Sequence, residues 1–172
     1  MRTTCTFIVL IAWAAAPALA QSVTPAPVSL GGDIGVFAPF ESGSSASFTG
    51  RFTADVYSWD KLGMRFAAGF ANPTLGDKPF DSRANLVYVS GGLFQRLAAS
   101  AYNPYLHGGG GIYHLSGYRS GTDLGLSFGG GFELPVRLRR AVLTPELSAY
   151  VISGDGPHFS LALTVGLHTR PR

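Results

Sequence analysis

Two patterns in the sequence contain side chains that could act as a nucleophile and its base. His158 and Ser160 lie two residues apart, so on a β-strand they would share one face, where an imidazole can activate a hydroxyl. Gly125-Leu126-Ser127-Phe128-Gly129 matches the G-x-S-x-G motif of serine hydrolases, and His107-Gly108-Gly109-Gly110 matches the oxyanion motif of esterases. Both patterns would indicate nucleophilic catalysis.

The surrounding residues do not support a hydrolase. A G-x-S-x-G serine needs a turn from a strand into a helix, but apolar residues alternate on either side of Ser127 and no helical periodicity follows. His107 and His114 are seven residues apart, so on one strand they would face opposite sides and could not form a local metal pair. We therefore assign no catalytic residue, no metal ligand and no cofactor-binding residue.

The strongest signal is the alternation of apolar residues with a period of two. Phe159-Ser160-Leu161-Ala162-Leu163-Thr164-Val165-Gly166-Leu167 has five large apolar residues on one parity and small or polar residues on the other. Successive side chains of a strand point to opposite faces, and a run of about 9–11 residues matches a tilted membrane-spanning strand. We expect eight such strands, at residues 30–40, 47–58, 61–71, 85–96, 104–116, 122–134, 142–152 and 158–168.

The first twenty residues differ from the rest of the chain. Arg2 precedes a short apolar run at residues 7–16, and Pro17 and Ala18-Leu19-Ala20 then supply the small-x-small pattern of a signal-peptide cleavage site. Cleavage after Ala20 is expected, with cleavage after Ala18 as the alternative. Cys5 is the only cysteine and lies in this segment, so the mature chain has no disulfide. The expected division is a cleaved signal peptide at residues 1–20, an extended lead-in at 21–29, a barrel at 30–168 and a C-terminal extension at 169–172.

The composition indicates which face of the strands meets water. Charged residues make up 13% of the chain, against about 25% in ordinary soluble domains. A soluble periplasmic barrel that binds an apolar ligand needs a polar exterior, and this chain has too few charges to cover one. The formal net charge of +3 is small and dispersed, which gives no indication of a nucleic-acid partner. We predict an all-β, eight-stranded antiparallel up-and-down transmembrane β-barrel, with the soluble barrel as an alternative.

The parity of each strand assigns its side chains to the two faces of the barrel wall. The apolar parity is expected to face lipid, and its members include Phe48, Phe52, Phe66, Phe70, Leu126, Phe128, Leu161, Leu163 and Val165. The other parity is expected to place a network of charges in the lumen, formed by Arg51, Asp55, Arg65, Glu133 and Glu146. Aromatic residues near strand ends are expected in interfacial girdles, and these are Phe40, Trp59, Tyr102, Tyr105, Tyr113 and Tyr118.

Symmetric turns predict which lumen charges meet. A turn centred at Asp60 sets Asp55 directly opposite Arg65, with Arg51 one step above as a possible third member. A turn centred between residues 139 and 140 brings Glu133 close to Glu146, and we expect these two carboxylates to share a cation.

Glycine runs on two neighbouring predicted strands have two interpretations. Residues 108–111 and 129–131 could line a groove for a ligand or a lipid chain. They could instead make room for bulky lumen side chains and permit the curvature of a narrow barrel. An eight-stranded interior is just filled by side chains, which favours packing and argues against a wide pore.

With its signal peptide, eight alternating strands and short turns alternating with Gly/Ser/Asp/Pro loops, the chain resembles the small outer-membrane β-barrels of the OmpA-like and OmpX-like type over residues 30–168. That resemblance implies secretion to the periplasm and a location in the cell outer membrane. It also implies a monomer surrounded by outer-membrane lipids, with the barrel assembly machinery and periplasmic chaperones as partners in biogenesis. The chain departs from the family pattern at Leu167-His168-Thr169-Arg170-Pro171-Arg172, where an aromatic residue usually ends the last strand.

The expected function is that of a non-enzymatic integral outer-membrane protein with an envelope or surface role and a lumen filled by side chains. The alternative enzyme would act on outer-membrane lipid through His158 and Ser160, which loosely resemble the His-x-Ser pair of barrel lipid A deacylases. In those enzymes an Asn follows the Ser and a Glu lies on a later strand. Here Leu161 follows Ser160, the strand is the last, and the parity points both side chains inward.

Overall fold

The structure is a computed structural model that describes residues 27–58, 61–75, 82–97, 102–117, 120–136, 140–154 and 158–169. The predicted signal peptide and residues 21–26 of the predicted lead-in lie outside these ranges. Trp59 and Tyr118, two of the predicted girdle residues, also lie outside them.

Eight long strands occur within the described residues, each within two residues of its predicted bounds. They are β1 (Val28–Pro39), β2 (Ser47–Tyr57), β3 (Leu62–Ala71), β6 (Asn85–Arg96), β7 (Pro104–Ser116), β8 (Gly121–Phe132), β10 (Ala141–Ile152) and β11 (His158–Thr169). The strand pattern extends slightly into the predicted terminal segments, because β1 begins at Val28 and β11 continues to Thr169.

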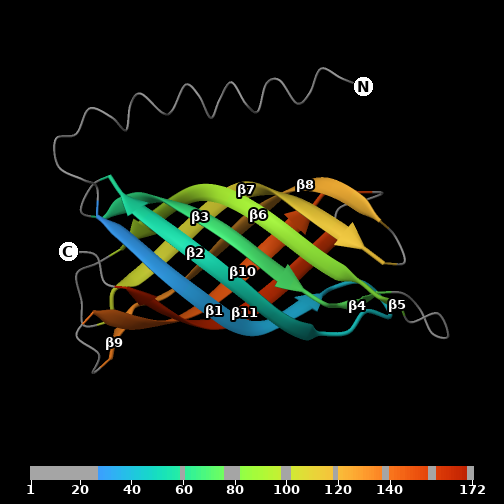
Figure 1. The fold of residues 1–172 in the computed structure, drawn as a ribbon, viewed down its shortest axis with the longest axis horizontal. Helices are drawn as coiled ribbons and strands as arrows, with labels where there is room; N and C mark the ends of the chain where they lie inside the picture. Colours follow the sequence, from blue (N-terminus) through green and yellow to red (C-terminus); the bar gives the residue numbers. More distant parts are fainter. Residues whose placement is uncertain are drawn as a thin grey trace, which may run out of the picture.

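The long strands form one closed antiparallel barrel (Figure 1). Each pairs with the next along the chain, and β11 closes the sheet by pairing with both β10 and β1. Closure leaves no free edge, which is the condition for a sheet to sit in hydrocarbon. The predicted fold class is confirmed.

Three short strands were not predicted. β4 (Thr74–Leu75) and β5 (Ser82–Arg83) pair with each other between the predicted strands at 61–71 and 85–96, and Thr74 also bridges to Ser45. β9 (Leu134–Pro135) continues the pairing with β10 beyond the end of β8. The β4–β5 ribbon therefore extends the wall at the end of the barrel opposite the start of β1 and the end of β11 (Figure 1).

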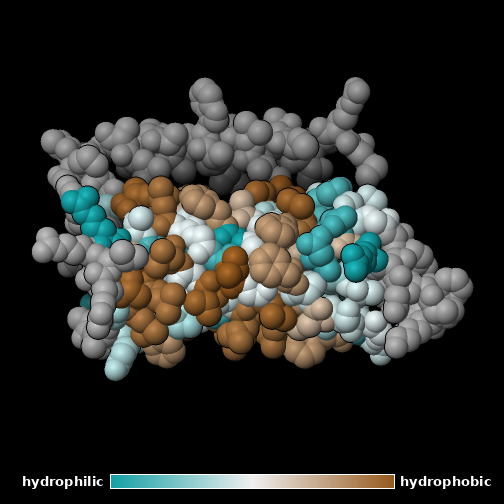
Figure 2. Space-filling model, turned by 60° about the horizontal axis from the view of Figure 1, so that its bottom comes forward, coloured by the Kyte–Doolittle hydropathy of each residue, from teal (hydrophilic) through white to brown (hydrophobic). Residues whose placement is uncertain are grey.

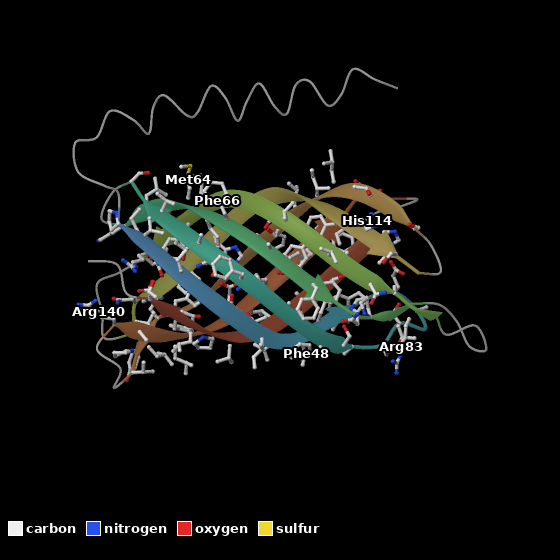
Figure 3. The ribbon with its side chains drawn as sticks, viewed as in Figure 1. Phe48, Met64, Phe66, Arg83, His114 and Arg140 are labelled. Atoms are coloured by element: carbon white, nitrogen blue, oxygen red, sulfur yellow. The ribbon has the colours of Figure 1, made fainter. Side chains whose placement is uncertain are left out.

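The two faces of the wall differ as the alternation predicts. Among the predicted lipid-facing residues, Phe48, Phe52, Phe66, Phe70, Leu126, Phe128, Leu163 and Val165 are exposed and Leu161 is half-buried. Apolar side chains gather on the outer wall between two more polar ends (Figure 2). Met64 and Phe66 of β3 project away from the barrel in Figure 3. No helix in the described ranges is long and apolar enough to cross a membrane.

Aromatic residues fill much of the lumen. Phe37, Tyr88, Tyr113 and Tyr150 pack together toward the end that carries β4 and β5. Tyr57, Phe94 and Tyr105 form a second cluster nearer the end where β1 begins and β11 finishes. The girdle prediction is therefore wrong for Tyr105 and Tyr113, which are both 1% exposed. Their odd numbers put them on the lumen parity of β7, where packing against other rings outweighs the preference of tyrosine for an interface.

Several lumen glycines make room for these large side chains. A Cβ at Gly131 would lie 2.8 Å from the Tyr105 hydroxyl oxygen, and one at Gly129 would lie 2.7 Å from His107 Nε2. A Cβ at Gly109 would overlap the carbonyl oxygen of Gly91 on the neighbouring strand. These contacts support the packing interpretation of the glycine runs.

Candidate functional site: a buried charge network

Strand parity and barrel closure bring five charged side chains together in the lumen. Asp33 comes from β1, Arg51 and Asp55 from β2, Arg65 from β3 and Glu146 from β10. All five residues are at most 7% exposed. Burying charges is costly unless they are paired and hydrogen-bonded, so the geometry of the partners decides whether this network can exist.

Glu146 lies at the centre of the network. Its Oε1 accepts hydrogen bonds from Arg51 Nη1 and from Ser148 Oγ, both at 2.6 Å. Its Oε2 accepts hydrogen bonds from Arg65 Nη1 at 2.7 Å and from the Tyr105 hydroxyl at 2.8 Å. Both carboxylate oxygens are therefore saturated by donors, and one carboxylate bridges two guanidinium groups.

Arg65 also binds Asp55, at the register that the symmetric turn predicts. The two residues face each other across the β2–β3 ladder, with Arg65 Nε 2.7 Å from Asp55 Oδ1 and Arg65 Nη2 2.9 Å from Asp55 Oδ2. The guanidinium lies over the rings of Phe94, at 4.7 Å, and Tyr105, at 5.1 Å. This bidentate, stacked arrangement is one that lysine could not reproduce.

Arg51 is joined to the network differently from the prediction. It does not bind Asp55; its Nε lies 3.1 Å from Asp33 Oδ2, and it connects to Arg65 through Glu146. Asp33 in turn lies 2.9 Å from His168 Nε2. Asp33 and His168 were not predicted as members of the network, although each occupies the lumen parity of its strand and could have been found by that signal.

Glu133 belongs to a separate pair near the end of β8. Its Oε1 accepts hydrogen bonds from Arg96 Nη2 at 2.7 Å and from Arg96 Nε at 3.1 Å. The expectation that Glu133 and Glu146 share a cation is therefore wrong. The β8–β10 hairpin is offset by two residues from the symmetric turn, so Gly131 faces Glu146. A shift of two residues leaves each side chain on the same face of its strand, so both carboxylates remain in the lumen. The shift also moves them apart along the barrel, and each binds different arginines.

Exchanging the charges of Asp55 and Arg65 should test their pairing. Asp55→Arg or Arg65→Asp alone leaves like charges buried together and should cost about 3–5 kcal/mol of unfolding free energy. The double variant should recover about 1–2 kcal/mol of that loss, but not all, because Arg65 also binds Glu146. Urea titration followed by gel mobility of the folded form measures all three variants. A double variant no more stable than the worse single variant would contradict the pairing.

Ser148, His107 and Glu146 have the composition of a catalytic triad but not its geometry. In a working triad the acid and the serine bind different nitrogens of the imidazole. Here His107 Nε2 lies 3.0 Å from Glu146 Oε1 and 3.3 Å from Ser148 Oγ, so the same nitrogen faces both groups. Arg51 also holds the carboxylate. This cluster therefore serves as packing for the network and has no activated nucleophile.

The structure does not form a catalytic site from either sequence pattern, the His158 and Ser160 pair or the G-x-S-x-G motif around Ser127. His158 Nδ1 forms a short contact with Glu41 Oε1, and no hydrogen bond joins it to Ser160 within the described residues. Ser127 lies in the middle of β8, buried on the lumen face, and no helix follows it in the described ranges. The described part of the chain contains no cluster of three or more residues that could ligate a metal ion.

Comparisons with known proteins identify the fold. No protein-family model matches the sequence, and no curated protein matches it. Among solved structures, Neisserial surface protein A (NspA) has a TM-score of 0.61 at 16% identity, covering 83% of this chain and 96% of that one. A major outer membrane protein from Thermus thermophilus has a TM-score of 0.67 at 14% identity, covering 85% and 99%.

The attachment invasion locus protein Ail of Yersinia pestis has a TM-score of 0.55 at 16% identity, covering 84% of this chain and 99% of that one. Ail has also been determined in a phospholipid bilayer nanodisc. These likenesses extend over nearly the whole of each matched chain. They confirm the predicted resemblance in fold to the small barrels.

Proposed function

We propose that this chain, which has the fold of the small eight-stranded outer-membrane β-barrels, is a non-enzymatic integral protein of the outer membrane with an envelope or surface role. The observation that carries the proposal is the distribution of polarity across one wall: the charges are inside and the large apolar side chains are outside. A soluble barrel requires the reverse distribution. The alternative of a soluble carrier is therefore not favoured.

The outer surface of the wall carries too many exposed apolar side chains to be stable in contact with water. Phe128 is 57% exposed, Leu126 62% and Leu163 61%, and similar residues occur on every long strand. Fully burying a side chain of this size is worth about 1.5–3 kcal/mol, so transferring the whole belt from water into lipid provides a large driving force. Outer-membrane lipids are the surroundings that this belt requires.

The interior supports a closed protein rather than a solute channel. The charge network crosses the lumen from β2 and β3 to β10, and aromatic clusters lie on both sides of it. Buried Arg and Glu side chains that pair with one another close the path, since opening it would expose unpaired charges. The arrangement of His107, Ser148 and Glu146 argues against catalysis within the lumen.

The proposal includes the partners that such a barrel needs during biogenesis. A chain with this apolar exterior requires periplasmic chaperones and the barrel assembly machinery to reach the membrane. The last strand ends at Thr169 without an aromatic residue. The β1–β11 ladder closes the barrel, and two side-chain hydrogen bonds extend it at this end: Ser29 Oγ donates to the Thr169 carbonyl at 2.6 Å, and the amide of Leu30 donates to Thr169 Oγ1 at 2.8 Å. Because β1 pairs with β11 of the same chain, no strand edge is left for a second copy, and we expect the barrel to be monomeric.

Membrane fractionation tests the proposal directly. The mature protein should remain in the membrane pellet after a urea wash, and its gel mobility should change on heating, because a closed barrel resists unfolding by detergent. The soluble periplasmic fraction, probed on the same gel, provides the comparison. Recovery of a folded barrel in that fraction would refute the membrane assignment and support the soluble carrier.

A further inference from the structure

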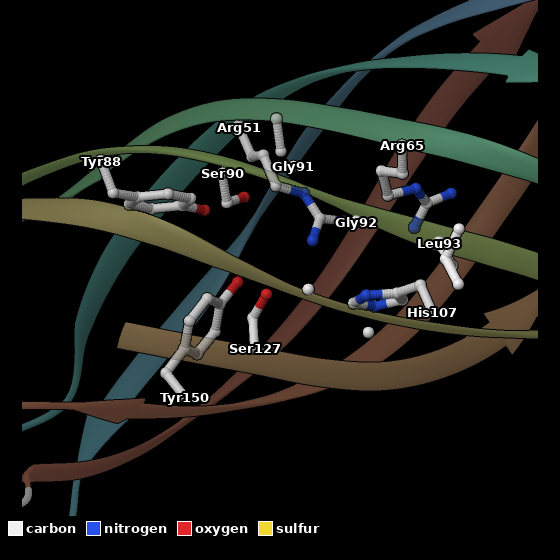
Figure 4. Close-up of a pocket in the computed structure, with 13 residues that line it drawn as sticks. Arg51, Arg65, Tyr88, Ser90, Gly91, Gly92, Leu93, His107, Ser127 and Tyr150 are labelled. Carbon is white, nitrogen blue, oxygen red and sulfur yellow. The ribbon is translucent and has the colours of Figure 1, made fainter. Parts of the chain in front are cut away.

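A small cavity lies in the lumen beside the charge network. Its polar lining comes from Arg51, Arg65, Tyr88, Ser90, His107, Ser127 and Tyr150, and its volume is about 20 Å³. On one side the wall is nearly bare backbone, because glycines at positions 91, 92, 108 and 109 line it. Figure 4 shows the Arg51 guanidinium directed into the space that the side chains of Ser127 and Tyr150 enter from the other side.

Arg51 has one donor group that the network does not use. Its Nε binds Asp33 and its Nη1 binds Glu146, whereas Nη2 is buried without a hydrogen-bond partner among the described residues. The whole residue is 7% exposed. A buried cationic N–H group left unpaired is costly, so this donor indicates a ligand that accepts hydrogen bonds.

All of the polar side-chain groups around the cavity can donate a hydrogen bond. Two guanidinium groups, an imidazole and four hydroxyls line it, and none of the described lining residues is a carboxylate. Asp33 and Glu146 bind Arg51 through its other two nitrogens and are not part of this lining. Hydroxyl groups can turn their protons toward an anion, and the guanidinium presents its N–H donors in a fixed planar arrangement.

We propose that this cavity binds one small monovalent anion of the size of chloride, held by Arg51 Nη2 and the hydroxyls of Ser127, Ser90 and Tyr150. The volume is enough for one water-sized ligand and excludes polyatomic anions such as gluconate. The anion would pair the unused donor and fix the guanidinium between β1, β2 and β10. This site is independent of the proposed membrane function, because it depends only on the folded lumen.

Bromide is the probe that locates the ligand. Crystals of the detergent-solubilised wild-type barrel grown in bromide should show an anomalous peak within hydrogen-bonding reach of Arg51 Nη2. Ser127→Val should abolish the peak, because two methyl groups replace the hydroxyl and fill the cavity. Density for water alone at this position in wild type would overturn the proposal, whatever the variant does.

Stability in different salts provides a solution test with a matched control. Ser160→Val makes the same change at a buried lumen serine that does not line the cavity. With a Kd of about 50 mM, replacing gluconate by roughly 0.15 M chloride should raise the folded-to-unfolded ratio about four-fold. Wild type and Ser160→Val should respond equally, and Ser127→Val should not respond. Equal responses in both variants would show a general salt effect and refute the site; if Ser127→Val does not fold, the bromide map decides.

Discussion

Glu146→Gln should destabilise the folded barrel by about 3–5 kcal/mol. We expect no larger effect from any other replacement of a single lumen residue by an uncharged one. Both oxygens of Glu146 accept hydrogen bonds, from Arg51 and Ser148 on one and from Arg65 and Tyr105 on the other. A glutamine in either orientation must point its NH₂ group at a guanidinium donor. The substitution therefore removes the shared counter-charge and leaves donors facing each other.

Glu133→Gln is the matched control for this prediction. Among the described residues Glu133 pairs with Arg96 alone and does so through one side-chain oxygen, so a glutamine carbonyl can take its place. The Arg96 side chain is 20% exposed and can recover some hydration. We expect a loss of about 1 kcal/mol, as for partly exposed ion pairs. Urea titration in detergent, followed by gel mobility, compares the two variants. Equal losses would show that Glu146 is not the centre of the network.

Phe128→Arg should prevent stable insertion into a bilayer. Phe128 lies at the centre of the exposed apolar run of β8, between Leu124 and Phe132, and its cross-strand neighbours are Gly108 and Ala149. An arginine facing the bilayer midplane costs about 2–4 kcal/mol. Small neighbours provide no polar partner for the guanidinium. The yield of heat-modifiable protein after refolding into phospholipid vesicles should fall accordingly.

Phe132→Arg controls for depth on the same strand and the same face. Phe132 is the last residue of β8 and is also exposed, so an arginine there can reach the interface at a cost of about 0–1 kcal/mol. We expect this variant to insert with nearly the wild-type yield. If Phe128→Arg inserted as well as Phe132→Arg, the outer face of β8 would not be in contact with the hydrocarbon.

Local patterns in the chain were sufficient to predict the barrel and the two faces of its wall. Alternation with a period of two is a property of one strand, and no information from the rest of the molecule is needed to read it. The pairing of Asp55 with Arg65 is of the same kind, because only four residues of the chain separate β2 from β3 and so short a connection leaves few registers open. Contacts between neighbours along the chain are therefore accessible from sequence.

The same reasoning gave wrong registers or missed strands where the connection between two strands is longer. The pairing of β8 with β10 is offset by two residues from the symmetric turn, and β4 and β5 form between two predicted strands, where no strand was expected. A turn of several residues can close at more than one register. A shift of two residues leaves the parity of each side chain unchanged. The lumen position of Glu133 was therefore predicted correctly, but its pairing with Arg96 was not predicted.

The partners within the lumen were decided by tertiary structure alone. Arg65 on β3 and Glu146 on β10 lie four strands apart in either direction round the barrel, and they meet only because β11 closes onto β1. Their 81-residue separation in the chain carries no local signal of this contact. The sequence by itself determined which residues point inward; the closure and stagger of eight strands decided which of those meet, because contacts across a lumen depend on the relative heights of opposite walls.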